Sequence, residues 1–211
     1  MEVIDISIRT ITISSIASLL ASTWSLPLSY ALSGSKSRYS IVVREFFNAT
    51  IGIPTVLIGL MVYLAFSRSG PLGYLNILYT PQAIILGQSI LVTPLLVVLF
   101  TDIFREYRSR YWELALTLGA TEKQAALMIV REAGFNIITA YLLSFARAVG
   151  ELGVALLVGG NIKGYTRVLS TAIALEIERG RFEDAFTLGL ILLLIVVLIN
   201  IAVRVLWRRI R

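Results

Sequence analysis

The sequence predicts an all-α membrane protein, and three observations lead to this fold class. Hydrophobic residues make up 57% of the 211 residues and charged residues only 15%, which is outside the range of soluble domains. The charged residues lie in short segments between long apolar blocks, a segregation that a soluble helical bundle does not require. Each block is long enough for a helix that crosses an apolar core of ~30 Å, which takes roughly 20 residues.

Five apolar blocks are predicted to span the membrane within one domain, about residues 8–207. We read the first block as a retained span, because neither a basic leader nor a small-residue cleavage site is clear before it. Its many serines and threonines favour packing against other helices. We expect Pro27 to loosen its last turn and Pro81 to begin the third span. The predicted spans are about 8–33, 45–67, 82–101, 134–158 and 185–207.

Basic residues predict the orientation of these spans, because cytoplasmic loops are enriched in Lys and Arg. With the amino terminus outside, the cytoplasmic side receives twelve basic residues: Lys36, Arg38, Arg44, Arg105, Arg108, Arg110, Lys123, Arg131, Arg204, Arg208, Arg209 and Arg211. The outer side receives six: Arg9, Arg68, Lys163, Arg167, Arg179 and Arg181. We therefore expect a multi-pass protein of the cell membrane with its amino terminus outside and its carboxyl terminus in the cytoplasm.

Several kinds of chemistry are excluded by residues that the sequence lacks. There is no cysteine and no histidine, which removes disulfides, Cys/His zinc sites and Ser-His or Cys-His catalysis. No G-x-x-x-x-G-K-[ST] loop is present to hold ATP phosphates. The net charge of +6 needs no nucleic acid, because the basic residues flank the spans. We predict membrane lipid as a partner and no catalytic residue, metal site or cofactor on this chain.

A long amphipathic segment, about 106–132, separates the third and fourth predicted spans. In its core, YWELALTLGATEKQAALMIVR, one helical face carries Tyr111, Leu114, Ala115 and Leu118. Gly119 is predicted to end this helix in the left-handed conformation, and Thr121 with Gln124 fits a capping box that opens a second helix. The sequence therefore predicts two helices outside the bilayer whose apolar face needs a docking partner.

This segment resembles the cytoplasmic EAA loop of binding-protein-dependent ABC importer permeases, whose pattern is E-A-A, three residues, G, nine residues, I-x-L-P. The matching residues are Glu113, Ala115, Gly119 and Ile129; Leu114 replaces the middle alanine, and Arg131-Glu132 replaces Leu-Pro. In the family, the loop inserts into a groove on the ATP-hydrolysing subunit. The resemblance implies that this ATPase-coupling role falls on Glu113, Leu114, Ala115, Gly119, Ala120 and Thr121.

The fourth predicted span carries Arg147 and Glu151, four residues apart and therefore on one helical face, close enough to pair. A charge at the bilayer centre costs roughly 2.5–3.5 kcal/mol, so we expect both side chains to face the bundle interior or a water-filled path. Two interpretations stay open: the charges neutralise each other and anchor packing, or they take part in a path or gate. The small residues Ala146, Gly150 and Gly153 favour close helix approach.

The loop after this span, about 159–184, is predicted to fold back onto the bundle, because VLSTAIALEI is too apolar to lie free in water. Gly159-Gly160-Asn161 is typical of a helix end. Thr166 and Arg167 are placed on a short helical stretch whose amino-terminal end would suit an anion. The candidate path or gate residues are Arg147, Gly150, Glu151, Asn161, Thr166 and Arg167.

Four stretches resemble the tungstate-specific branch of the molybdate, tungstate and sulfate permeases: SRSGPLGYLNILYTPQA, ALTLGAT, FARAVGELGVALLVGGNI and YTRVLSTAIALE. The resemblance implies a type I ABC importer core of five transmembrane helices with a cytoplasmic two-helix coupling loop. It also implies an extracellular substrate-binding protein and two copies of an ATPase subunit that carries ATP and Mg. Tungstate rests on the resemblance alone, and molybdate or sulfate stays open.

One five-helix chain is too small to enclose and gate a path, so we expect a homodimer with C₂ symmetry. Two other classes of membrane protein would show different sequence features. A secondary transporter would show inverted repeats and more ionisable residues within its spans than Arg147 and Glu151. An intramembrane enzyme would need a base near a serine or threonine nucleophile, and the spans offer none.

Overall fold

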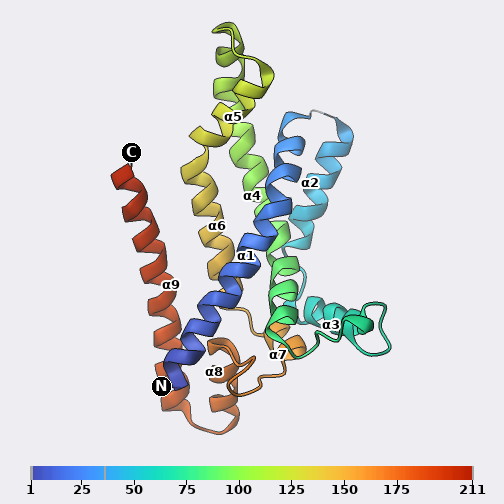
Figure 1. Cartoon of the computed structure of the whole chain (residues 1–211), viewed down its shortest axis with the longest axis vertical. Coiled ribbons are helices and arrows are strands. Elements are labelled where there is room, and N and C mark those ends of the chain that lie inside the picture. The colour runs from blue at the N-terminus through green and yellow to red at the C-terminus, as the bar shows by residue number, and fades with distance from the viewer. Residues whose placement is uncertain (1, 36, 211) are drawn as a thin grey trace. The chain divides into compact units, whose positions relative to one another are not determined.

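The computed structural model describes residues 2–35 and 37–210, and every regular element in these two ranges is helical (Figure 1). Lys36, Arg211 and the side chains of Arg204, Arg208 and Arg209, which entered the charge comparison, lie outside the described residues. The elements are α1 (Glu2–Gly34), α2 (Arg38–Thr50), α3 (Thr55–Phe66), the 3₁₀ turn η1 (Gly73–Leu75), α4 (Pro81–Thr117), α5 (Glu122–Glu132), α6 (Gly134–Val149), α7 (Gly153–Gly159), α8 (Leu169–Glu178) and α9 (Phe182–Ile210).

Three of the described helices, α1, α4 and α9, are each long and apolar enough to cross a membrane. The number rises to as many as five if α2 with α3, and α5 with α6, each form one bent span. The all-α membrane class is therefore confirmed. The count of five spans stays a prediction, and the second and fourth predicted spans are interrupted in the structure.

The second predicted span is divided at residues 51–54 into α2 and α3. Pro54 directly precedes α3; it cannot donate a backbone hydrogen bond, and it disfavours helical backbone at Ile53. On the amino-terminal side α2 begins at Arg38, ahead of the predicted start of the second span at about residue 45, and the Ser37 side chain accepts a hydrogen bond of 3.2 Å from the Ser40 amide. Polar capping thus starts the helix earlier than the apolar pattern indicated.

The third predicted span and the first helix of the amphipathic segment form a single helix, α4, of 37 residues. At 1.5 Å per residue this helix is about 55 Å long, well beyond an apolar core of ~30 Å. Pro81 is its first residue, as predicted, and Pro94 lies within it without ending it. Pro27 likewise does not end α1, which continues to Gly34. Prolines inside α1 and α4 are therefore tolerated, as is common in membrane helices.

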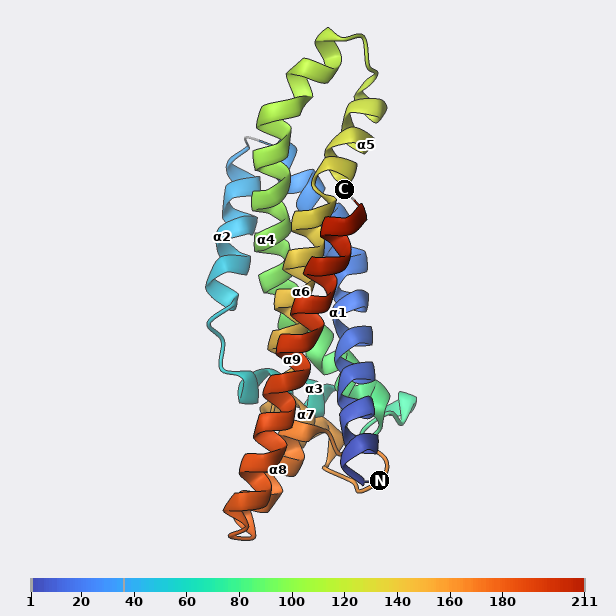
Figure 2. The same cartoon turned by 90° about the vertical axis from the view of Figure 1, so that its left-hand side faces the viewer.

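The chain divides into two compact units, and α1, α4 and α6 contribute residues to both. The first unit contains the chain up to Leu19, Ile53–Val92, and the chain from Phe145. Its main core surrounds α7 and consists of Ile13, Val62, Phe66, Ala83, Ile84, Val154, Ala155, Val158 and Val168. A second cluster joins α8 to the starts of α1 and α9 through Ile6, Leu169, Ala172 and Leu188. The predicted folding back of the apolar loop is therefore confirmed, and Figure 2 shows α8 beside the start of α9.

Two glycines allow α3 and α7 to approach closely within the first unit. A Cβ added to Gly59 would lie 3.1 Å from the Gly153 carbonyl oxygen, and a Cβ on Gly153 would lie 3.2 Å from the Val56 amide nitrogen. The predicted role of Gly153 in close helix approach is thus confirmed. Gly150 differs, because a Cβ there would meet only the Ala146 carbonyl oxygen of its own segment, at 3.7 Å.

The second unit contains Leu20–Gly52 and Thr93–Ser144. Here α1 and α4 are joined by a hydrogen bond of 2.9 Å from Trp24 Nε1 to Thr93 Oγ1 and one of 3.0 Å from the Ser29 hydroxyl to the Val97 carbonyl oxygen. An ion pair of 2.7 Å joins Arg44 of α2 to Asp102 of α4. This unit also carries the whole amphipathic segment at the end of α4.

We expect Gly153→Ala to lower the free energy of unfolding by about 1–3 kcal/mol, because the added methyl group overpacks the α3–α7 contact. Thermal unfolding of the detergent-purified protein measures the change. Gly189→Ala in α9 is the control, since a Cβ there meets no atom within 4 Å and alanine favours the helix. Equal stability of the two variants would contradict the close contact between α3 and α7.

Candidate functional site

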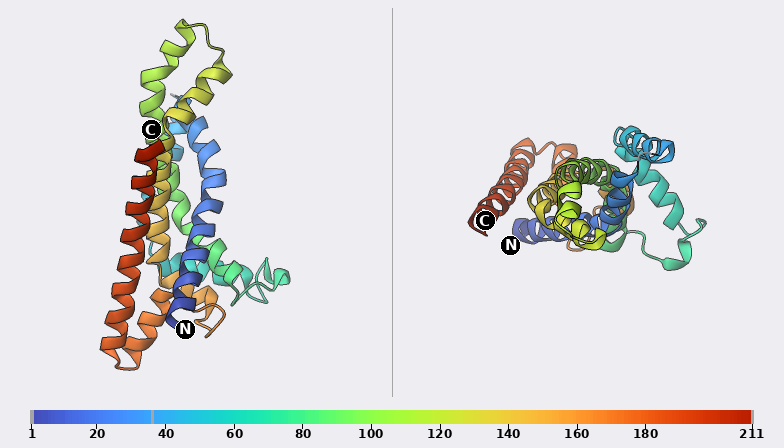
Figure 3. Two further views of the ribbon diagram at one scale, coloured as in Figure 1. Left: turned by 60° about the vertical axis from the view of Figure 1, so that its left-hand side comes forward. Right: turned by 90° about the horizontal axis from the view of Figure 1, so that it is seen from above.

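The end of α4, a short turn and α5 form a hairpin, which we call the α4–α5 hairpin (residues 106–132; Figure 3). Gly119 ends the first leg with φ at +86°, in the left-handed region. The Gly119 amide donates to the Leu116 carbonyl oxygen and the Ala120 amide to the Ala115 carbonyl oxygen, each at 3.0 Å. This pair of bonds defines a Schellman motif, which confirms the predicted glycine end of the helix.

The second leg begins with the capping box that the sequence predicts. The Thr121 hydroxyl accepts a hydrogen bond from the Gln124 amide, and Gln124 Oε1 accepts one of 2.8 Å from the Thr121 amide. The turn of the hairpin is thus fixed from both sides, by the motif at Gly119 and by the cap at Thr121. Such a turn presents a constant surface to a partner.

The outer surface of the hairpin is strongly apolar. Leu114 near the end of α4 and Leu118 just after that helix are 51% and 79% exposed, and Leu116 is also exposed. Ala115 is buried instead, together with Ala125 and Ile129 of α5. The predicted apolar face is therefore split: its small residue packs inside the hairpin and its leucines face outward. Of the other predicted coupling residues, Glu113, Gly119 and Thr121 are exposed and Ala120 is half-buried.

A second group of candidate residues lies where α6 gives way to α7. Arg147 and Glu151 form an ion pair of 3.1 Å, in which the Glu151 side chain is 2% exposed and that of Arg147 is 43% exposed. The predicted pairing is present, but Glu151 lies beyond the end of α6 at Val149 rather than on the same helix. The reason is local: the other carboxylate oxygen of Glu151 accepts a hydrogen bond of 3.1 Å from the Val154 amide, at the start of α7.

Two further side chains satisfy backbone groups at this break. Gln88 of α4 donates a hydrogen bond of 3.0 Å to the Ala148 carbonyl oxygen and accepts one of 3.2 Å from the Ser14 hydroxyl of α1. The Ser170 hydroxyl of α8 donates to the Glu151 carbonyl oxygen at 2.8 Å. The sequence analysis did not select Gln88 or Ser170. A polar side chain within an apolar span was the available signal for Gln88, because such a group needs a partner.

The remaining candidate residues hold the loop between α7 and α8. The Thr166 hydroxyl donates to the Gly159 carbonyl oxygen and accepts from the Ile162 amide, and Arg167 Nε donates to Asn161 Oδ1 at 3.1 Å. Gly160 caps α7 in the left-handed conformation, as the predicted helix end requires. However, Thr166 and Arg167 precede α8, which begins at Leu169, because Thr171 caps the Val168 amide. The two residues therefore do not lie on a helix.

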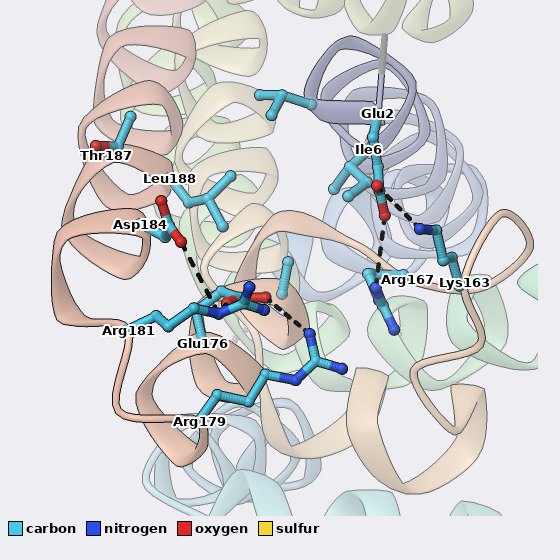
Figure 4. Close-up of a pocket in the computed structure, with 12 residues that line it drawn as sticks. Glu2, Ile6, Lys163, Arg167, Glu176, Arg179, Arg181, Asp184, Thr187 and Leu188 are labelled. Carbon is cyan, nitrogen blue, oxygen red and sulfur yellow. Dashed lines mark hydrogen bonds and ion pairs between the residues drawn. The ribbon is translucent and has the colours of Figure 1, made fainter.

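A cavity of ≈ 460 Å³ lies beside this loop, with charged residues around its wall (Figure 4). Glu2 pairs with Lys163 at 3.1 Å and faces Arg167 at 3.7 Å. On another part of the wall Glu176 pairs with Arg179 and Arg181. These cations therefore already have carboxylate partners, and the anion-binding role of Arg167 and Thr166 stays a prediction.

The first turn of α8 connects the Arg147–Glu151 pair to the loop between α7 and α8, both of which lie in the first unit. Ser170 bonds to the backbone of Glu151, and the next residue, Thr171, accepts a hydrogen bond of 3.3 Å from the Asn161 side chain. Within residues 2–35 and 37–210, no three His, Cys, Asp or Glu side chains gather in a way that could hold a metal ion. The arrangement offers ion pairing and hydrogen bonding beside helix breaks, which suits the binding and passage of a solute.

Comparisons with known proteins identify a family of membrane transport proteins. The family model for the binding-protein-dependent transport system inner membrane component matches residues 25–211. The chain is 36% identical to the tungstate uptake system permease protein TupB of Peptoclostridium acidaminophilum, over 94% of this chain and 87% of the relative. It is 37% identical to a probable anion ABC transporter permease protein of Haloferax volcanii, over 93% of this chain and 87% of the relative.

Other relatives have names that refer to tungstate, molybdenum or sulfate transport. A TupB protein of Campylobacter jejuni is 35% identical over 75% of this chain and 66% of its own length. The molybdenum transport permease ModB of Mycobacterium tuberculosis is 27% identical over 94% of this chain and 76% of its own length. The sulfate transport permease CysT of Salmonella typhimurium is 26% identical over 84% of this chain and 67% of its own length. The chain belongs to the family of binding-protein-dependent transport system inner membrane components, and it is a permease subunit of an ABC importer.

Proposed function

We propose that this chain, as a homodimer, forms the membrane path of an ATP-driven importer for tungstate. The observation that carries the substrate is the 36% identity to a tungstate permease over 94% of this chain, against 26–27% to the molybdate and sulfate permeases. Molybdate and sulfate are the alternatives, because all three are tetrahedral dianions of similar shape. The family membership favours an ATP-driven importer over the secondary transporter weighed from the sequence.

We assign ATPase docking to the α4–α5 hairpin. Leu114 and Leu118 are exposed on a segment whose turn is fixed by two capping motifs, so burial of their side chains by a partner would be favourable. At ~25 cal/mol per Å², burying one leucine contributes roughly 1.5–3 kcal/mol. The partner would be an ABC ATPase subunit, in two copies for a permease dimer, and it would carry the ATP and Mg.

This assignment requires the hairpin to lie in the cytoplasm. The ratio of twelve basic residues to six favours that side, and it was obtained from the loops without reference to the docking role. With the same orientation, the charged cavity near Glu2 and Lys163 would face the outside. An extracellular substrate-binding protein would deliver the oxyanion from that side.

Transport then follows from two states of the dimer. ATP-driven closure of the two ATPase subunits would draw the docked hairpins together. Because α4 is one helix from Pro81 to Thr117, the displacement of a hairpin would pass along a rigid rod into the apolar region. Access to the central path would switch from the inside to the outside. The leucines exposed along α9 would face lipid or the second subunit.

Within the path, Arg147 is our candidate for contact with the oxyanion. Its side chain is 43% exposed, whereas Glu151 is buried and already accepts a backbone hydrogen bond. Arginine presents a planar set of donors that matches oxyanion geometry. Glu151 would orient Arg147 and keep the pair neutral when no substrate is bound.

We expect Leu118→Asp to abolish co-purification of the ATPase subunit and to abolish transport, with normal membrane insertion, because a carboxylate in an apolar groove is strongly unfavourable. Pull-down from detergent extracts and uptake into proteoliposomes measure the two effects.

Tyr74→Asp is the matched control for this substitution. Tyr74 is 74% exposed in η1, outside the hairpin, so its replacement leaves ATPase binding intact. A Leu118→Asp variant that still recruits the ATPase and transports would contradict the docking assignment.

We expect Arg147→Gln to destabilise the protein by roughly 3 kcal/mol, because it leaves the Glu151 carboxylate buried and unpaired. The double variant Arg147→Gln/Glu151→Gln should recover stability and still transport poorly, because the path has lost its guanidinium. Thermal unfolding and uptake assays separate the two quantities. Normal transport by the double variant would show that the pair serves packing alone.

We expect the reconstituted importer, supplied with its binding protein, to take up tungstate in preference to molybdate and to exclude sulfate. Uptake of radiolabelled tungstate with unlabelled competitors measures the preference. If unlabelled molybdate or sulfate competes as well as unlabelled tungstate or better, tungstate would no longer be the assigned substrate. The proposal of an ATP-driven importer would stand.

A further inference from the structure

Arg108 lies on the α4 leg of the α4–α5 hairpin, ahead of the predicted docking residues that begin at Glu113. Its guanidinium carbon lies 4.1 Å from the centre of the Trp112 ring and 5.5 Å from the centre of the Tyr30 ring of α1. Tyr30 in turn meets Phe104 edge-to-face at 5.4 Å. Phe104, Arg108 and Trp112 follow one another at four-residue spacing, so one face of α4 carries an aromatic–cation–aromatic row against α1.

Gly34, the last residue of α1, makes room for this contact. A Cβ on Gly34 would overlap Arg108 Nη1 and lie 2.7 Å from Cζ. The Arg108 guanidinium therefore occupies the space that a side chain at position 34 would take. Among the described residues, Arg108 forms no ion pair with a carboxylate, and it contacts α1 at the Tyr30 ring and at Gly34.

Of the α1–α4 contacts described above, the contact of Arg108 lies nearest in sequence to the docking residues. Trp112 directly precedes Glu113, whereas the hydrogen bonds to Thr93 and Val97 reach α4 more than ten residues earlier. Glu113, Leu114 and Ala115 already belong to the same helix as Arg108. The carboxyl-terminal end of α1, by contrast, belongs to a separate helix. It can move with the hairpin only through side-chain contacts between the two.

We propose that Arg108 is the positioning residue that makes the end of α1 follow the hairpin, so that a displacement caused by the ATPase moves α1 and α4 together. This inference rests on the proposed coupling role of the hairpin, and Arg108 is not one of the six coupling residues that the sequence predicts at 113–115 and 119–121. A planar guanidinium can stack on one ring while facing another, which a lysine ammonium does less well. The contact therefore depends on arginine at 108 and on glycine at 34.

The test uses the complete importer in proteoliposomes, with its ATPase subunit and binding protein, and measures substrate imported per ATP hydrolysed. Arg108→Gln removes the cation, and Gly34→Ala displaces it with one methyl group. We expect each to lower the ratio by roughly two- to thirty-fold, the range for loss of a cation–π contact, while ATPase co-purification stays unchanged. Arg108→Lys should give an intermediate ratio.

The double variant Gly34→Ala/Arg108→Gln identifies the cause. If Gly34 acts only by admitting the guanidinium, the added methyl group has no further effect once Arg108 is gone, and the double variant equals Arg108→Gln. Arg110→Gln is the matched control: it removes the same charge two residues away, from an exposed pair with Glu106 on α4 itself, and should leave the ratio unchanged.

A ratio of substrate imported per ATP hydrolysed equal to that of the wild type in Arg108→Gln would overturn the inference. A double variant in which the separate effects of Gly34→Ala and Arg108→Gln multiply would also overturn it. Should Arg108→Gln fail to insert, Gly34→Ala decides alone, because alanine is well tolerated at a helix end. Failure of the unmodified chain to bind the ATPase would instead reject the proposed function, so the two failures are distinguishable.

Discussion

A helix break in apolar surroundings must be satisfied by the protein itself, and this constraint governs the first unit. Water is not available there to bond free amides and carbonyls, and each unpaired group would cost several kcal/mol. At the break between α6 and α7, the partners come from three different places in the chain: Glu151 for the Val154 amide, Gln88 for the Ala148 carbonyl and Ser170 for the Glu151 carbonyl. The break is thus a built element of the fold, held by α4 and α8.

The same constraint explains the hydroxyl groups of α1. Six of them are buried at intervals of three or four residues along one face: Thr10, Ser14, Ser18, Ser22, Ser25 and Ser29. In the first unit the Thr10 hydroxyl accepts from the Leu169 amide at 2.9 Å and Ser14 donates to Gln88. In the second unit Ser29 donates to the Val97 carbonyl. Small hydroxyl side chains thus let α1 approach its neighbours closely and still leave it able to bond to them.

Local chemistry explains which parts of the structure could be predicted from the sequence. The turn at Gly119 and the cap at Thr121 depend on residues within five positions of each other, so the sequence alone contains the whole cause. The break after α6 depends on Gln88 and Ser170, which are distant in sequence, and no proline marks it. Pro94, the stronger local signal, lies in an unbroken helix. The charges of Arg147 and Glu151 could therefore be recognised in the sequence, whereas the groups that surround them could not.

An unbroken α4 and a broken α6–α7 have different mechanical consequences. α4 is one helix over its whole length, although Pro94 within it cannot donate a backbone hydrogen bond, so a displacement can pass along its axis. At the break, the chain is held by side-chain bonds of about 3 Å to separate elements, and one ion pair includes the Arg147 side chain, which is 43% exposed. Such bonds can be exchanged one at a time for bonds to an anion, with no helix unfolded. In the mechanism that we propose, the permease would receive force through the long α4 and respond to substrate at the break beside the buried carboxylate.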